Sequence, residues 1–183
     1  MSVAEKLMTA AEYEKLPDDG QPTELVRGRI VNLNVPTPRH GMVCSNICYI
    51  IRNHVDERDL GRVVVNDSGI ITQRVPDTVR GADVAYYSFQ RLPKGPLPAG
   101  YLDVVPELAF EVRSPSDRWS KLLGKVAEYL DAGVTVVCCL DPDDQTLHLY
   151  RADQPVVILK SSDRLSLPDL LPDLDVTVGR FFD

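Results

Sequence analysis

"PELAFEVRSPSDRW", residues 106–119, places a carboxylate inside an otherwise apolar strand. Apolar residues surround Glu111, and Ser114 and Pro115 end the strand abruptly. A buried carboxylate costs free energy unless a cation or hydrogen-bond donors meet it. Glu111 is therefore the first candidate for a functional residue.

The segments after this stretch predict a strand-helix-strand unit. Apolar residues recur at helical spacing after Ser116 and Asp117, either of which could cap the helix, and Gly133 is placed to end it in a left-handed conformation. The continuously apolar run 134–141 is typical of a central strand. A helix between two such strands predicts one parallel crossover.

The remaining pattern predicts antiparallel strands on both sides of this unit. The capping-box pattern from Thr9 to Glu12 predicts a short helix, and a longer helix is expected over 40–55. Strands and a strand pair are expected at 23–35 (turning near Gly28), 61–66, 69–74, 82–88, 145–152 and 155–160; residues 90–106 form a loop, and the tail 166–183 packs back on the sheet. The chain is thus expected to form a single domain, residues 1–183, of the α/β (α+β) class, with a mixed β-sheet flanked by helices.

Composition excludes some functions and leaves others open. Hydrophobic residues make up 44% of the 183 residues, which suits one sizeable core. The net charge of −7 argues against a general nucleic-acid coat, but it allows a local basic groove or a metal site. The four cysteines, at 44, 48, 138 and 139, lack the spacing of a disulfide framework or zinc finger, so we expect free thiols. We see no signal peptide and no apolar run that could span a bilayer, which favours a cytoplasmic protein.

Two carboxylates have matching surroundings on their predicted strands. Asp83 shares a strand face with Ala85, and Glu111 shares one with Ala109. Such small neighbours leave room for an ion, a water molecule or a substrate. If the strands pair, the carboxylates converge, and a divalent cation relieves their repulsion. Oxygen ligands suit Mg²⁺ or Mn²⁺.

Lys125 is a third candidate, at the border of the apolar face of the predicted helix. Its stem could lie along the core while its ammonium reaches the two carboxylates and stabilises charge on a phosphate. We then expect its replacement to affect catalysis more than stability. The alternatives are a structural Glu111–Lys125 ion pair, a solvated Lys125, and a turn-capping role for Asp83.

Three further residues are possible accessory groups. Glu24 begins a strand and could equally be an exposed charge, and His40 opens a helix, where many histidines have structural roles. Arg113 begins a turn with Ser114 and Ser116 that could hold a phosphate, or could be a plain loop and helix cap.

Several segments in order resemble the Uma-type restriction endonuclease family, a branch of the PD-(D/E)XK nuclease superfamily, from Thr9 to Phe182. They are "TELVRGRIV", "RH" opening a helix, "ADVAYYS", "PELAFEVRSPSDRW", "KVAEYLDAGV" and "CCLDP". The resemblance implies a restriction-endonuclease-like core in which Asp83 and Glu111 hold a divalent metal. It also implies that Glu24 and His40 match an acidic residue and a histidine of the family.

The sequence departs from the superfamily pattern at two positions. Arg113 stands where the superfamily usually has a lysine, and arginine cannot act as a base. The resemblance implies that the lysine role moves to the following helix, at Lys125. Ala82 stands where the family usually has a proline, which removes a backbone constraint but no ligand.

Together these observations predict a Mg²⁺-dependent endonuclease that hydrolyses DNA phosphodiester bonds. The alternative is a catalytically inactive binding or assembly module with the same fold. A homo-oligomer, most simply a dimer, is expected from the resemblance and from exposed strand edges.

Overall fold

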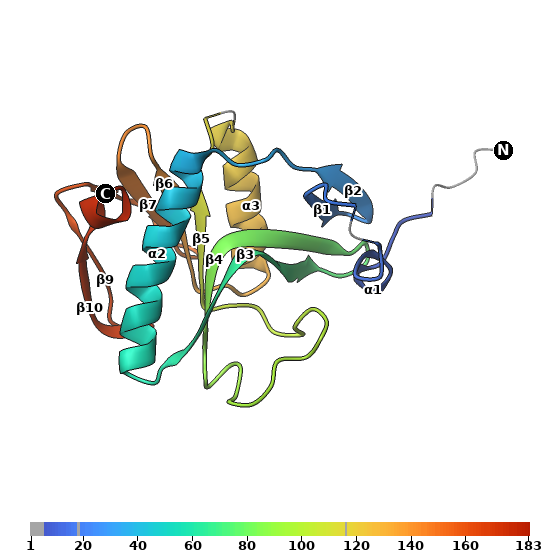
Figure 1. The fold of residues 1–183 in the computed structure, drawn as a ribbon, viewed down its shortest axis with the longest axis horizontal. Helices are drawn as coiled ribbons and strands as arrows, with labels where there is room; N and C mark the ends of the chain where they lie inside the picture. The colour runs from blue at the N-terminus through green and yellow to red at the C-terminus, as the bar shows by residue number, and fades with distance from the viewer. Residues whose placement is uncertain (1–5, 18, 116) are drawn as a thin grey trace.

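The computed structural model describes residues 6–17, 19–115 and 117–183 as a mixed sheet flanked by helices (Figure 1). The sheet has eight strands in the order β2-β1-β4-β5-β6-β7-β8, with β3 paired to β4. The strands are β1 (Thr23–Val26), β2 (Arg29–Asn32), β3 (Gly61–Gln73), β4 (Thr78–Ser88), β5 (Leu108–Val112), β6 (Val136–Asp141), β7 (Thr146–Tyr150) and β8 (Val157–Lys160). Only β5 and β6 pair in parallel among these neighbours. The predicted fold class and the single parallel crossover are both confirmed.

Two long helices cover the two faces of this sheet (Figure 1). Ile47 and Ile51 of α2 (Pro38–Glu57) share a core with Phe110. Tyr129 of α3 (Trp119–Asp131) shares the opposite core with Ala109. Because side chains alternate along a strand, Glu111 turns toward α3 while its neighbours turn toward α2.

The chain ends form smaller elements at the sides of the sheet. Helix α1 (Ala10–Tyr13) begins with the predicted capping box, in which Thr9 and Glu12 exchange hydrogen bonds. The tail packs back on the core as predicted, through residues such as Leu171 and Phe181. It also contains more regular structure than expected: strand β9 (Arg164–Leu167), strand β10 (Leu171–Thr177) and the 3₁₀ helix η1 (Val178–Phe181).

The start of α3 differs from the sequence prediction. Its N-cap is Arg118, whose side chain makes no capping hydrogen bond. Asp117 instead accepts a hydrogen bond from the Ser114 backbone N–H, so its predicted capping role is wrong. Ser116, the other predicted cap, lies outside the described residues. Gly133 has φ +101°, which confirms the left-handed end of this helix.

The two strands predicted at 61–66 and 69–74 are one strand, β3, interrupted by a β-bulge. The pairing with β4 shifts register between Val65 and Ser68. Asn66 and Asp67 between them have φ angles of 66° and 53°. Their polarity resembles a turn in the sequence, but here the strand bends and then continues along β4.

The edge of β4 opposite β3 is shared by two different strands. β1 pairs with it at Val79, whereas β5 pairs from Val84 to Tyr86. Residues 81–83 lie between these two partners, and we call this place the fork. At the fork, the Gly81 N–H donates to Glu24 of β1, and the Gly81 carbonyl faces Lys125 of α3.

Gly81 at the fork packs directly against the bulge of β3. A Cβ atom at this position would lie 2.6 Å from Asp67 Cβ and 2.7 Å from its carbonyl oxygen. We predict that Gly81→Ala lowers the free energy of unfolding by about 1–3 kcal/mol, the usual cost of overpacking.

Gly124→Ala on α3 is the matched control for this prediction. A Cβ at Gly124 meets nothing within 4 Å, so the change should stabilise by about 0.5–1 kcal/mol. Urea denaturation measures both variants. An unchanged unfolding midpoint for Gly81→Ala would contradict this prediction, because it would show that the bulge shifts away from the added methyl group without cost.

Candidate functional site

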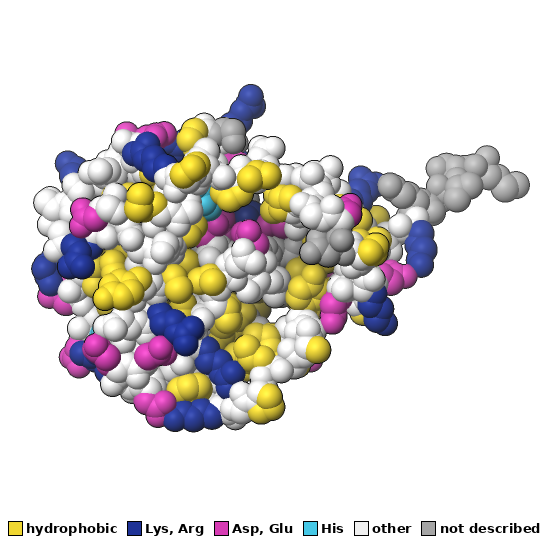
Figure 2. Space-filling model, viewed as in Figure 1, with side chains coloured by type: hydrophobic (Ala, Val, Ile, Leu, Met, Phe, Trp, Pro, Cys, Tyr) yellow, Lys and Arg dark blue, Asp and Glu magenta, His cyan; other side chains and the backbone are white. Residues whose placement is uncertain are grey.

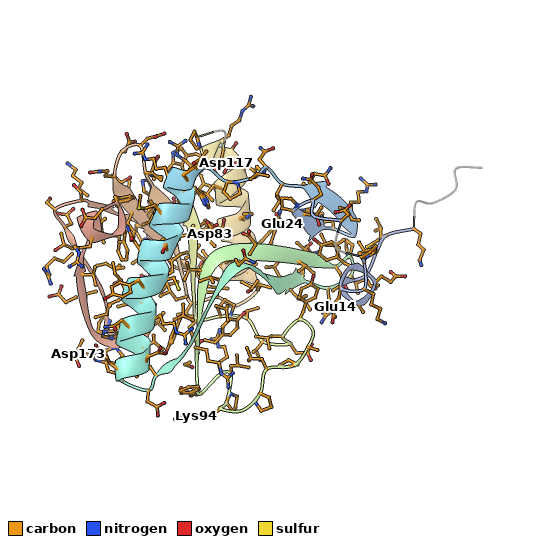
Figure 3. All side chains as sticks on the ribbon, viewed as in Figure 1. Glu14, Glu24, Asp83, Lys94, Asp117 and Asp173 are labelled. Carbon is orange, nitrogen blue, oxygen red and sulfur yellow. The ribbon has the colours of Figure 1, made fainter. Side chains whose placement is uncertain are left out.

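A pocket opens at the fork, between the N-terminal end of α2 and helix α3. Its charged lining includes Asp67, Asp83, Glu111, Lys121 and Lys125. Figure 2 shows acidic side chains beside a histidine near the centre of one face, with hydrophobic side chains around them. In Figure 3, the label of Asp83 lies beside α2, and that of Glu24, a residue of β1, lies on the other side of α3.

Lys125 joins two carboxylates across the fork. Its Nζ lies 2.9 Å from Glu24 Oε1 and 3.1 Å from Glu111 Oε2. A third, longer contact runs 3.5 Å to the Gly81 carbonyl oxygen. The ammonium side chain is 14% exposed and points into the site rather than to solvent. The structural ion pair considered from the sequence is therefore present, and it includes a second carboxylate.

Glu24 is held more firmly than its sequence position suggests. Its Oε2 accepts a hydrogen bond of 2.8 Å from Arg80, and its Oε1 accepts one of 3.1 Å from the Gly81 N–H. Arg80 also pairs with Glu128 of α3 at 2.6 Å. Both carboxylate oxygens of buried Glu24 therefore have hydrogen-bond partners, and Glu24 holds the ammonium of Lys125 in place.

Asp83 and Glu111 lie across from each other where β4 and β5 separate. The last paired residues are Val84 and Phe110, and continuing that register by one residue places Asp83 opposite Glu111. Asp83 Oδ2 accepts a hydrogen bond of 2.6 Å from the Val112 N–H. Its Oδ1 faces His40 Nε2 at 3.5 Å. The structure thus brings both predicted carboxylates and His40 into one pocket.

The electrostatics of the pocket are dominated by burial and by an excess of carboxylates. Burial raises the pKa of Glu111 to about 7, against the opposing effect of Lys125 and with a further rise from Asp83. Tyr129 donates a 2.7 Å hydrogen bond to Glu111 Oε1. Burial would raise the pKa of Glu24, but Lys125 and Arg80 hold it below its ordinary value.

Asp67 is the functional candidate that sequence reasoning missed. The β-bulge turns its side chain into the pocket, and burial followed by the charge of Asp83 raises its pKa. Burial would lower the pKa of His40, yet its hydrogen bond to Asp83 raises it. The only sequence signal for Asp67 was a polar pair inside an apolar run.

These donors fit a divalent cation. Asp67, Asp83 and Glu111 present carboxylate oxygens to one pocket. Lys125 pairs with Glu111 as well as Glu24, and Arg80 pairs with Glu24, so no ion pair with either cation is formed by Asp67 or Asp83 among the described residues. Hard oxygen donors of this kind suit Mg²⁺ or Mn²⁺.

Arg113 is not brought to this pocket. Its guanidinium binds Asp141 at 2.8 and 3.0 Å and Asp143 at 2.9 Å, near the Trp119 ring. This ion pair joins β5 to β6 and the following turn. Ser114 of the same turn does line the pocket.

A mixed sheet flanked by helices, with a charged pocket at a fork in the sheet, is a nuclease-like fold. Residues 10–179 match the Uma2 family, described as "putative restriction endonuclease", and the chain belongs to this family. A crystal structure of a putative nuclease belonging to DUF820 from Anabaena variabilis ATCC 29413 is similar, with a TM-score of 0.84 and 21% sequence identity. The similarity covers 96% of this chain and 97% of that one. No curated protein matches the chain at a significant level.

Two other features bear on the expectations from sequence. In the described residues, no helix combines the length and apolar character needed to cross a membrane. The four cysteines are free: Cys44 and Cys48 are half-buried on α2, and Cys138 and Cys139 are buried on β6.

The contacts of Lys125 revise the expectation that its replacement affects stability only slightly. Lys125→Met leaves two buried carboxylates without their shared cation, so we predict a loss of about 3–5 kcal/mol of folding free energy at pH 8. Since Lys125 lowers the pKa of Glu111, removing it raises that pKa further. Glu111 therefore takes up a proton as the pH falls, and the loss should be smaller at pH 6.

Lys121→Met, one turn earlier on α3, is the matched control. Lys121 is exposed and forms no ion pair within residues 6–17, 19–115 and 117–183, so its replacement should change stability by about 0.5 kcal/mol or less. Urea denaturation at both pH values provides the comparison. Equal, pH-independent losses in the two variants would contradict the assigned bridge.

Proposed function

We propose that the protein is a Mg²⁺- or Mn²⁺-dependent endonuclease that hydrolyses phosphodiester bonds in DNA. The observation that carries the proposal is the pocket that Asp83, Glu111 and Asp67 line together with Lys125. Membership of the Uma2 family supports the same reaction class.

Asp83 and Glu111 are the residues we propose as metal ligands, with Asp67 as an added carboxylate. A bound divalent cation would supply Lewis-acid polarisation of the phosphate and a more acidic water molecule. The Val112 N–H fixes one oxygen of Asp83, and Tyr129 fixes one oxygen of Glu111. Each carboxylate therefore keeps a defined orientation in the pocket.

Lys125 is proposed to stabilise charge on the phosphate or to orient the attacking water. Its two carboxylate partners approach to 2.9 and 3.1 Å, whereas its third partner, the uncharged Gly81 carbonyl, lies at 3.5 Å. The carbonyl contact is the weakest, so a phosphate oxygen or a water molecule can replace it at the least cost. Glu24 then acts as a positioning residue, because it holds the ammonium in place.

His40 has a proposed accessory role at the pocket. Its ring faces Asp83, and although burial would lower the pKa of His40, the Asp83 carboxylate raises it. A protonated ring at this position adds a positive charge where a phosphate would enter. Arg113, bound to Asp141, is left out of the proposed catalytic set.

DNA would meet a small basic region on an acidic protein. Lys121 lines the pocket and is exposed one turn before Lys125. With a net charge of −7, the chain cannot rely on general attraction to phosphates. Lys121 is therefore the residue that we propose for contact with the DNA backbone next to the cleaved bond.

The second reading remains an inactive nuclease-fold module, in which the same ion pairs only hold the fold together. The direction of Lys125 into a pocket favours the enzyme. Self-association as a dimer stays a prediction, for which the exposed Val157 and Ile158 of the outer strand β8 provide one candidate edge. A cytoplasmic location also stays a prediction.

The central prediction concerns metal-dependent cleavage. The parent should cleave DNA with Mg²⁺ or Mn²⁺ and lose this activity with EDTA. Asp83→Asn and Glu111→Gln should each lower kcat by about 100-fold or more, because each removes a charge at the reacting centre. Asp67→Asn should lower it by about 10-fold, as expected for a supporting group.

Asp103→Asn is the control with the same chemical change. Its carboxylate is 94% exposed in the loop between β4 and β5, so activity should be unchanged. Circular dichroism checks that every variant is folded. A folded parent that cleaves no DNA with either metal would favour the inactive module.

Replacing Lys121 should weaken DNA binding rather than chemistry. Lys121→Gln removes one phosphate contact, so the slope of log Kd against log salt should fall by about 1. Lys160→Gln, an exposed lysine on β8, should leave the slope unchanged. Fluorescence anisotropy with labelled DNA at several salt concentrations makes the measurement. Equal slopes for parent and Lys121→Gln would place the DNA elsewhere.

A further inference from the structure

The α2 wall of the pocket carries donors of a different chemical kind from the carboxylates. His40 and Cys44 lie four residues apart on α2, so their side chains project from the same helix face. His40 Nδ1 lies 3.4 Å from Cys44 Sγ, and His40 Nε2 lies 3.5 Å from Asp83 Oδ1. One donor atom from each of the three residues lies within 4.8 Å of the others.

The two distances start from different ring nitrogens of His40, and each is close to the ligand separation around a tetrahedral ion. Zinc bonds of about 2.0–2.3 Å at tetrahedral angles place ligand atoms roughly 3.3–3.6 Å apart. A single ring nitrogen of His40 must bind the ion, so the ring has to turn and the three donor atoms have to draw together from within 4.8 Å. Imidazole and thiolate donors favour Zn²⁺ and similar ions, whereas Mg²⁺ favours oxygen donors.

We propose that His40, Cys44 and Asp83 form a second metal site that binds Zn²⁺ or a similar transition-metal ion. Three protein ligands leave one position for water. Binding needs the Cys44 thiolate and a neutral His40 ring, so it releases the thiol proton to the solvent together with the proton of any His40 ring that was protonated beforehand.

Asp83 makes this site a competitor of the proposed catalytic one. Its Oδ2 accepts the Val112 N–H, whereas its Oδ1 faces His40, so Oδ1 is the oxygen that an ion beside His40 and Cys44 would bind. An ion held by His40 and Cys44 takes that oxygen away from the Mg²⁺ position beside Glu111. The second site is therefore inhibitory, and this inhibitory part rests on the proposed function.

Binding is tested with Co²⁺ as a coloured substitute for Zn²⁺, using the full reduced chain. One equivalent of Co²⁺ should produce thiolate-to-cobalt charge-transfer absorption in the near ultraviolet, and Zn²⁺ should remove it. Cys44→Ser should abolish this absorption. Cys48→Ser is the matched control, since Cys48 is also half-buried on α2 one turn later, and it should retain the absorption.

Inhibition is tested by adding Zn²⁺ to the Mg²⁺-dependent cleavage reaction. The Zn²⁺ concentration for half-inhibition should rise at least tenfold in Cys44→Ser and remain unchanged in Cys48→Ser. A folded parent without the cobalt absorption, or absorption that persists in Cys44→Ser, would overturn the site. Cobalt absorption without any nuclease activity would uphold the site and reject the proposed function instead.

Discussion

The ammonium of Lys125 between Glu24 and Glu111 is the interaction on which the rest of the site depends. It joins three elements, because the lysine comes from α3 and the two carboxylates come from β1 and β5. These strands use different parts of the same edge of β4 and do not pair with each other. Without a cation at this point, two buried carboxylates would face each other across the fork, which is costly in a medium of low polarity.

Much of this arrangement could be predicted from local sequence rules. Strand alternation placed Asp83 and Glu111 on a common side, and helical spacing brought Lys125 toward them. The continuously apolar run 134–141 also identified the central strand. These predictions succeeded because each depends on the geometry of one element, or of two elements that follow each other in the chain.

The features that were missed depend on contacts between distant segments. Asp67 enters the pocket only because a β-bulge in β3 turns it there, and its polar neighbourhood resembled a turn. Arg113 faces away because Asp141 and Asp143, on the far side of the crossover, bind its guanidinium. Glu24 was an accessory candidate, but its burial could not be predicted because its partners Arg80 and Lys125 are remote in sequence. Spacing along a single element carries no information about such partners.

The sharing of the β4 edge also has a consequence for the order in which the protein is assembled. β1 is made first and α3 much later, so contacts between them close a long loop and form slowly. A growing chain that ends after β5 already contains Asp83 and Glu111 but still lacks Lys125. Completion of the pocket must therefore follow synthesis of α3, and a truncated chain holds these carboxylates without their ammonium partner.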